Sequence, residues 1–286
     1  MRFSIYFVAS VLSAFGCTLS VIVTILLKRM HQNPLGKMVL HLSIVNLILA
    51  IQEIILEAIN YEYKCSDSFS CFLLKLLLSS RIFTNCGSLM WTCCFAHCLY
   101  TLGTEGSEDF LKAKYNTYFS ISYGATLITG IATYLLYSIL VNYQELNTFY
   151  VVDIFVSSFL CIQTVITFIV SSNYYIKGFT FARHREIRIS WILLLFPVIL
   201  LACNLLHNVV VVGIQLFSNA VSTSAWDFSL AVWVLQGCLT SLVYGLLGGV
   251  NEAIKEQCGQ ENPEPSELVG HNGITYHRHD ANHNTN

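Results

Sequence analysis

Three ionisable side chains interrupt long apolar stretches of this 286-residue chain, namely Glu53, Glu57 and Arg81. Glu53 and Glu57 are one turn apart, so a helix would present both carboxylates on one face. A charge buried in lipid costs on the order of 3 kcal/mol, which calls for a partner or a water-filled cavity. A pair between Arg81 and one of the glutamates would either belong to a binding cavity or only fix the packing of two helices.

A second set of polar residues is expected at the depth of these charges. Its members are Asp153, His207, Trp233 and Gln236. Together with the three ionisable residues they would line one ligand-binding cavity that opens to the outside. Asp153 would equally fit the headgroup zone of a membrane, and Trp233 an interfacial or packing position.

A third set is expected in the opposite half of the apolar stretches. It consists of His41, Asn46, Trp91, His97, Tyr100 and Tyr244. Polar contacts between helices in lipid contribute about 1 kcal/mol each, which suits contacts that break and re-form in a switch, although a static network is equally compatible. Pro197 is expected to kink its helix, which would then pivot.

The composition explains why these polar residues stand out. Hydrophobic residues make up 55% of the chain and charged residues 11%, and the mean hydropathy is +0.60. So few charges would not cover the surface of a soluble protein of this size, so the lipid bilayer is the expected solvent. The composition gives no support to nucleic-acid binding.

Seven apolar runs position the polar residues. They cover residues 3–27, 38–59, 71–102, 115–140, 151–176, 189–217 and 226–250. Runs of this length fit membrane-spanning helices of about 20 residues and are too long for barrel strands. The predicted fold is all-α, a seven-transmembrane helix bundle over residues 1–250. Residues 251–286 would form a tail, disordered after a short juxtamembrane helix.

The basic residues predict the orientation. The first, third and fifth loops and the tail hold Lys28, Arg29, Lys37, Lys112, Lys114, Lys177, Arg183, Arg185, Arg188, Lys255 and Arg278, whereas the opposite side holds Arg2 and Lys64. Because lysine and arginine accumulate on the cytoplasmic side, we expect the N-terminus outside and the tail in the cytoplasm.

Three sequence motifs resemble those of a known family. The segment LMWTCCFAHCLY at 89–100 matches a W-T-x-C-x-A-x-x-L-Y pattern. The segment GKMVLHLSIVNLILAI at 36–51 contains an L-S-x-x-(D/N)-L core, and LQGCLTSLVYG at 235–245 has the L-Q-G start and V-Y-G end. In this order they resemble helices three, two and seven of cyclic-AMP-receptor-like G-protein-coupled receptors.

The resemblance implies a plasma-membrane receptor that couples an unknown extracellular small ligand to a heterotrimeric G protein. The G-protein side would include Tyr100 and the basic residues Arg183, Arg185 and Arg188. Receptors of this kind usually bridge a cysteine atop the third helix to the second outer loop, but residues 141–152 contain none. Cys71 would instead pair with Cys65 or remain free, and Cys258 is a candidate for palmitoylation.

Other classes of membrane protein fit some of these residues. A seven-helix transporter is the main alternative, since the intramembrane acidic residues would also suit a substrate or proton path. A retinal protein needs a lysine in the last helix, and 226–250 has none. A zinc hydrolase needs ligands at one depth, whereas His41 and His97 are expected at the opposite end from His207. We therefore expect no enzyme, no metal and no cofactor.

Overall fold

The computed structural model describes most of the chain. The described residues are 5–27, 34–58, 68–105, 108–140, 146–184, 188–189, 195–216, 223–246, 268–270 and 274–276. Statements about what is present or absent below concern these residues.

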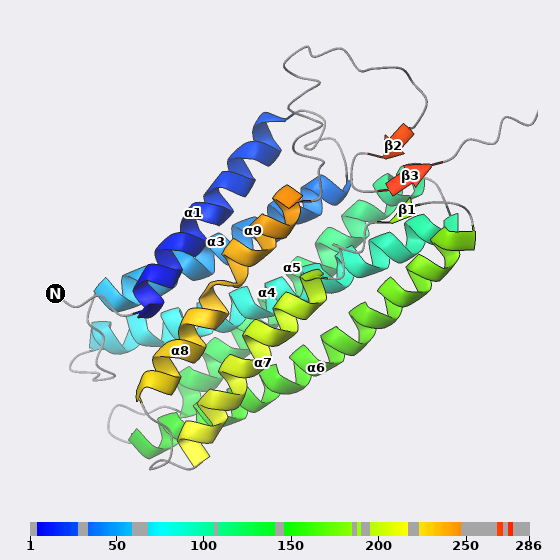
Figure 1. Cartoon of the computed structure of the whole chain (residues 1–286). Helices are drawn as coiled ribbons and strands as arrows, with labels where there is room; N and C mark the ends of the chain where they lie inside the picture. The colour runs from blue at the N-terminus through cyan, green and yellow to red at the C-terminus, as the bar shows by residue number, and fades with distance from the viewer. Residues whose placement is uncertain are drawn as a thin grey trace, which may run out of the picture.

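Seven helical segments make up nearly all of the described structure (Figure 1). They are α1 (Ile5–Leu26), α3 (Pro34–Ala58), α4 (Ser68–Glu105), α5 (Glu108–Leu140), α6 (Leu146–His184), α7 (Leu195–Leu216), and a last segment divided into α8 (Thr223–Val234) and α9 (Gln236–Leu246). The strands are β1 (Arg188–Ile189), β2 (Leu268–Gly270) and β3 (Ile274–Tyr276). Apart from these short strands, the fold is all-helical as predicted.

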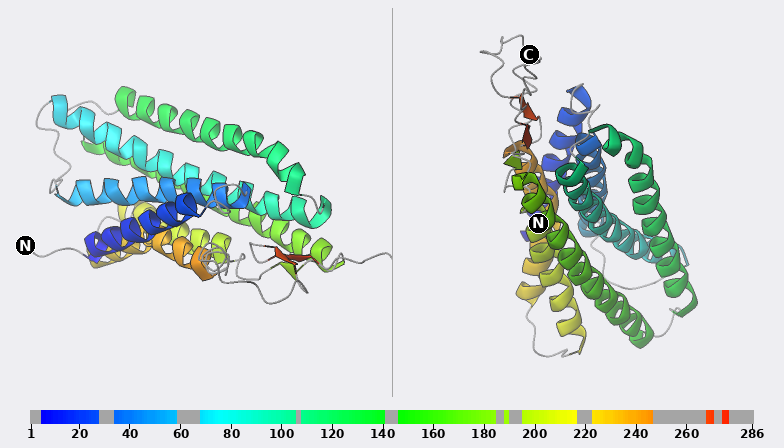
Figure 2. Two further views of the ribbon diagram at one scale, coloured as in Figure 1. Left: turned by 90° about the horizontal axis from the view of Figure 1, so that it is seen from above. Right: turned by 90° about the vertical axis from the view of Figure 1, so that its right-hand side faces the viewer.

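The helices form one bundle in which α4 is central. It packs against α3, α5 and α6, and α6 packs in turn against α7. The last segment closes the ring, because α8 and α9 both return to α1 (Figures 1 and 2). Polar residues of α4 are therefore surrounded by helices from both halves of the chain.

Polarity in the outer helices is the reverse of that in a soluble protein. In α1 the side chain of Phe15 is 70% exposed while Ser13 is fully buried, and in α5 Ile128 is 70% exposed while Ser122 is fully buried. Several buried hydroxyls are satisfied within their own helices, as where Thr24 donates to the Ser20 carbonyl at 2.7 Å. Such helices are suited to an apolar solvent.

Within the described residues, four helices are long and apolar enough to cross a membrane. They cover Ile5–Leu26, Pro34–Leu56, Lys112–Ile139 and Ile154–Gly178. Shorter apolar helices cover Val198–Gly213 and Asp227–Val243. Together with the reversed polarity, these helices support the prediction of a membrane protein with transmembrane helices.

Several helices extend beyond the predicted apolar runs. The fifth run was expected to end at residue 176, but α6 continues to His184, so Lys177 and Arg183 lie on a helix and not in a loop. Likewise α5 begins at Glu108, well before the run at 115–140, with Asp109 next to it. Acidic residues favour a helix N-terminus, and only the part of a helix inside lipid must be apolar, so hydropathy underestimates these ends.

The last helical segment is irregular. The described part of α7 begins at Leu195 with Pro197 in its first described turn, so the expected kink at Pro197 stays a prediction. The interruption lies at Leu235, between α8 and α9. Hydrogen bonds of helical type continue across it, from Leu235 N to Ala231 O at 3.0 Å and from Leu239 N to Leu235 O at 2.9 Å.

A short antiparallel sheet joins the tail to the connection that follows α6. The strand order is β1-β3-β2, with Arg188 opposite Thr275 and Ile189 opposite Ile274. Residues 268–270 and 274–276 of the expected disordered tail are thus strands. The pairing places this part of the tail at the end of the bundle where α6 ends (Figure 1).

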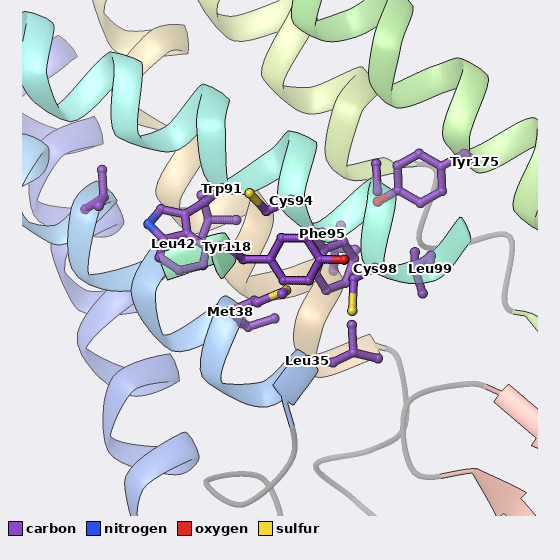
Figure 3. Packing of buried hydrophobic residues seen from close by; sticks show 14 of the residues in the cluster. Leu35, Met38, Leu42, Trp91, Cys94, Phe95, Cys98, Leu99, Tyr118 and Tyr175 are labelled. Atoms are coloured by element: carbon purple, nitrogen blue, oxygen red, sulfur yellow. The ribbon is translucent and has the colours of Figure 1, made fainter. Parts of the chain in front are cut away.

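The largest apolar cluster lies where α3 begins and α4 ends (Figure 3). Met38 of α3, Trp91 and Leu99 of α4, and Tyr175 of α6 are each about 1% exposed. Tyr118 of α5 packs into the same cluster. This end of the bundle is therefore a dense contact of four helices.

The helices α1 and α9 make a close contact beside α3. A Cβ on Gly237 would overlap the Ser13 hydroxyl, would lie 2.6 Å from the Cys17 sulfur and 3.2 Å from Asn46 Cβ. Small residues let membrane helices approach closely and gain packing contacts. Gly237 therefore fixes the distance between the first and last helices.

We expect Gly237→Ala to reduce stability by about 1–3 kcal/mol, the usual cost of overfilling a packed interior. Thermal unfolding in detergent, followed with a thiol-reactive fluorophore that labels buried cysteines as they become accessible, measures the change. Gly213→Ala is the matched control, since no neighbour lies within 4 Å of its added Cβ. Equal melting temperatures for the two variants would contradict the proposed close contact.

Candidate functional site

The predicted ion pair is present between α3 and α4. The Nε of Arg81 lies 2.9 Å from Oε1 of Glu53, and Nη2 lies 3.4 Å from Oε2. The Glu53 side chain is 2% exposed and that of Arg81 is 14% exposed. Two opposite charges so far from water stabilise each other, and each would be strongly destabilising without the other.

Arg81 also contacts the ring of Trp233, which in turn stacks on a second ring. Its guanidinium carbon lies 4.7 Å from the ring centre of Trp233 on α8, a distance suited to a cation–π interaction. The Trp233 ring stacks on His207 of α7, with centroids 4.6 Å apart and an interplanar angle of 4°. The predicted residues Glu53, Arg81, Trp233 and His207 thus form one cluster across four helices.

Asn204 connects this cluster to the middle of the bundle. Its Oδ1 accepts a hydrogen bond from Nε1 of Trp233 at 2.9 Å. Its Nδ2 donates to Oε1 of Gln236 at 2.6 Å and to the carbonyl of Leu200 at 3.1 Å. The side chain is fully buried, so these bonds satisfy its amide without water.

Gln236 continues the network to α3 and α4. Its Nε2 donates to the hydroxyl of Ser88 and lies 3.4 Å from Oδ1 of Asn46. Ser88 donates to the same oxygen of Asn46 at 3.3 Å, and Asn46 Nδ2 lies 3.5 Å from the Thr240 hydroxyl. Asn46 was expected in a separate switch set, but it belongs to the network that begins at Glu53 and Arg81.

A small cavity adjoins the ion-pair cluster. Its volume is about 40 Å³, and α4, α5, α6, α7 and α8 contribute to its walls. The polar side chains that line it include Arg81, Asn85, Ser157, His207 and Asn208. Arg81, His207 and Trp233 of the predicted ligand site line this cavity, whereas Gln236 lies in the network and is not among the described lining residues.

Asn85 was not singled out from the sequence. It follows Arg81 by four residues, so the two share one face of α4. Its side chain is 2% exposed, and neither its Nδ2 nor its Oδ1 has a hydrogen-bond partner among the described residues. The spacing from Arg81 was the signal that would have identified it.

His41 is at the opposite end of the bundle in an aromatic cluster. Its Nδ1 lies 2.9 Å from the Tyr123 hydroxyl and its Nε2 2.7 Å from the Tyr115 hydroxyl. The ring stacks on Trp91 with centroids 4.7 Å apart and an angle of 6°. His41 and Trp91, two members of the predicted third set, are thus in contact, and two tyrosines of α5 that sequence reasoning missed hold His41.

His97 has a separate set of partners. Its Nδ1 lies 2.7 Å from the Tyr118 hydroxyl, and its ring lies edge-on to Tyr174 at 5.0 Å. Tyr100 is 6.1 Å from His97 and 5.5 Å from Tyr174, between centroids. His41 and His97 therefore have different tyrosine partners.

Some predicted site residues lie outside what the structure describes. Cys65, Arg185 and Cys258 are outside the described residues, and the side chains of Glu57, Cys71, Asp153, Arg183, Arg188, Pro197 and Tyr244 are outside them as well. The possible Cys65–Cys71 disulfide, palmitoylation of Cys258 and the contributions of Glu57 and Asp153 to the cavity stay predictions.

Comparison with protein-family models and with curated proteins finds no match for this chain. The functional argument is therefore carried by the residues and their geometry. That geometry combines a cavity beside a charged cluster with a chain of polar contacts leading away from it, an arrangement suited to binding.

We expect Glu53→Gln to reduce the stability by about 3 kcal/mol, because it leaves Arg81 buried without its counter-ion. The double variant Glu53→Gln/Arg81→Met removes both charges and is expected to be more stable than Glu53→Gln alone. Thermal unfolding in detergent at fixed lipid content compares the three proteins. If the double variant is no more stable than Glu53→Gln alone, the ion pair does not stabilise the fold as described.

Proposed function

We propose that this chain is a G-protein-coupled receptor of the plasma membrane that transmits the binding of a small extracellular ligand to a heterotrimeric G protein. The proposal includes seven transmembrane helices, with α8 and α9 as the seventh, the N-terminus outside and the tail in the cytoplasm. The sequence resemblance to cyclic-AMP-receptor-like receptors agrees with it.

The observation that carries the proposal is the continuous polar network. It leads from Arg81 at the cavity through Trp233, Asn204 and Gln236 to Asn46 in the middle of the bundle. Five labelled helices, α3, α4, α7, α8 and α9, contribute to it. A ligand that contacts Arg81 is therefore connected to Asn204 of α7 through only two side chains, those of Arg81 and Trp233.

The strength of these contacts suits a switch. Each polar contact between helices in lipid contributes only about 1 kcal/mol, so partners exchange without unfolding the bundle. A ligand that binds one arrangement better than another shifts the population between them. The irregular residue Leu235 precedes Gln236, so the network reaches the last segment next to its interruption.

The expected G-protein surface lies at the other end of α4 and α6. There the two backbones are close, since a Cβ on Gly178 would lie 3.2 Å from the Tyr100 Cα. The ring of Tyr100 also lies 6.1 Å from that of Phe181. The helix α6 extends to His184 and carries Lys177 and Arg183 next to and beyond this contact. This helical end supports a basic surface to which the G protein would bind.

A transporter is the alternative function, in which the same charged residues would line a substrate path. The observed pair favours the receptor, since Glu53 is 2% exposed and its carboxylate is engaged by Arg81. A substrate path needs charged groups that are accessible in turn from each side of the membrane.

We expect the reconstituted chain to accelerate nucleotide exchange on at least one purified G-protein α subunit, with extracts as the source of ligand. Replacing Lys177, Arg183, Arg185 and Arg188 by glutamine should lower the rate by about tenfold, because basic residues at an interface steer association. Exchange is measured by binding of a fluorescent GTP analogue.

The matched control replaces Arg2 and Lys64, the basic residues expected on the outer side, by glutamine. This variant should retain the wild-type exchange rate. No exchange with any α subunit, combined with substrate flux into liposomes that depends on Arg81, would favour the transporter instead.

A further inference from the structure

The side chain of Asn85 is a buried amide without a partner. It lines the cavity, is 2% exposed, and both its nitrogen and its oxygen lack a hydrogen bond among the described residues. Buried amides in folded proteins are nearly always hydrogen-bonded, because an unsatisfied donor or acceptor is destabilising. The missing partners are therefore expected from an occupant of the cavity, which must accept one hydrogen bond and donate another.

The charges around the cavity are balanced. Arg81 is a cationic wall residue, and Glu53, which is not among the described lining residues, lies 2.9 Å from that guanidinium. The ring of His207 is stacked on Trp233. A charged occupant would lose its hydration and find no uncompensated charge of opposite sign in these described walls, so an uncharged group is favoured.

The size and the remaining walls limit the occupant further. A volume of about 40 Å³ corresponds to about three water-sized spheres, which is room for a group of a few non-hydrogen atoms. Leu78, Ile82, Val156, Leu160 and Val211 give the cavity an apolar part beside the polar one. A short alkyl substituent would contact these side chains while a polar head meets Asn85.

We propose that the cavity binds a small uncharged ligand, or an uncharged end group of a larger one, that carries an adjacent donor and acceptor and is represented most simply by a primary carboxamide. A carboxamide pairs with the Asn85 amide through two hydrogen bonds, whereas a carboxylate offers only acceptors and an amidinium only donors. This inference rests on the proposed function, since it names the ligand class of the same receptor site.

Three probes of nearly the same shape test the charge requirement. Acetamide is neutral, acetate is an anion and acetamidinium is a cation, and each has four non-hydrogen atoms. Saturation-transfer NMR on the full chain in detergent measures their binding up to about 100 mM, the range expected for so few atoms. Acetamide should bind at least about tenfold more tightly than the other two probes, which make one of the two hydrogen bonds.

Asn85→Leu is the variant that tests the contact. It should abolish acetamide binding and raise the melting temperature of the ligand-free chain, because an unsatisfied amide is replaced by an apolar side chain. Asn208→Leu is the matched control for stability. Asn208 donates to the Asn204 carbonyl at 2.9 Å, so its loss should lower the melting temperature. Val156→Phe, which fills the cavity from α6, provides a second test of binding if Asn85→Leu does not fold.

The proposal is overturned if acetate or acetamidinium binds as tightly as acetamide, or if none of the three binds, which would mean that water alone fills the cavity. It is also overturned if acetamide binding survives both Asn85→Leu and Val156→Phe.

None of these measurements involves a G protein. Binding without nucleotide exchange would therefore contradict the proposed function alone, and exchange without probe binding would contradict only the ligand class.

Discussion

The buried ion pair between Glu53 and Arg81 is the contact on which the polar network beside the cavity depends. It holds α3 against α4, and the guanidinium in turn determines where Trp233 of α8 lies. Trp233 then orients His207 by stacking and Asn204 by a hydrogen bond. Because no water is available in lipid to replace these partners, the position of one arginine is transmitted to four other helices.

The two ends of the bundle use different chemistry to hold their helices. Around Arg81 the contacts are an ion pair, amides and a cavity, and several groups have more than one acceptable partner. Around His41 and His97 they are ring contacts and tyrosine hydroxyl bonds inside the largest apolar cluster. Dense packing tolerates little rearrangement, whereas polar side chains beside a void have room to change partners.

Hydropathy predicted the order of the helices and their membrane character, and the cost of a charge in lipid predicted the Glu53–Arg81 pair. The roles of uncharged polar residues were harder to predict than those of charged ones. Asn85, Ser88 and Asn204 are single amides or hydroxyls in apolar runs, and the sequence does not show what surrounds them. Tyr115 and Tyr123 were missed because aromatic residues count as apolar, although their hydroxyls bind His41. The lengths of α5 and α6 were underestimated because hydropathy does not detect the polar ends of a helix.

The strand pairing between the tail and the connection after α6 has a mechanical consequence. Thr275 is paired with Arg188, so the backbone of the tail is coupled to the short strand that precedes α7. Any displacement of that strand must either carry the hairpin β2–β3 with it or break the ladder between β1 and β3. The tail is then a tether with a defined attachment point, and its two-residue ladder with β1 is a weak link that releases before the hairpin itself, whose strands pair over three residues.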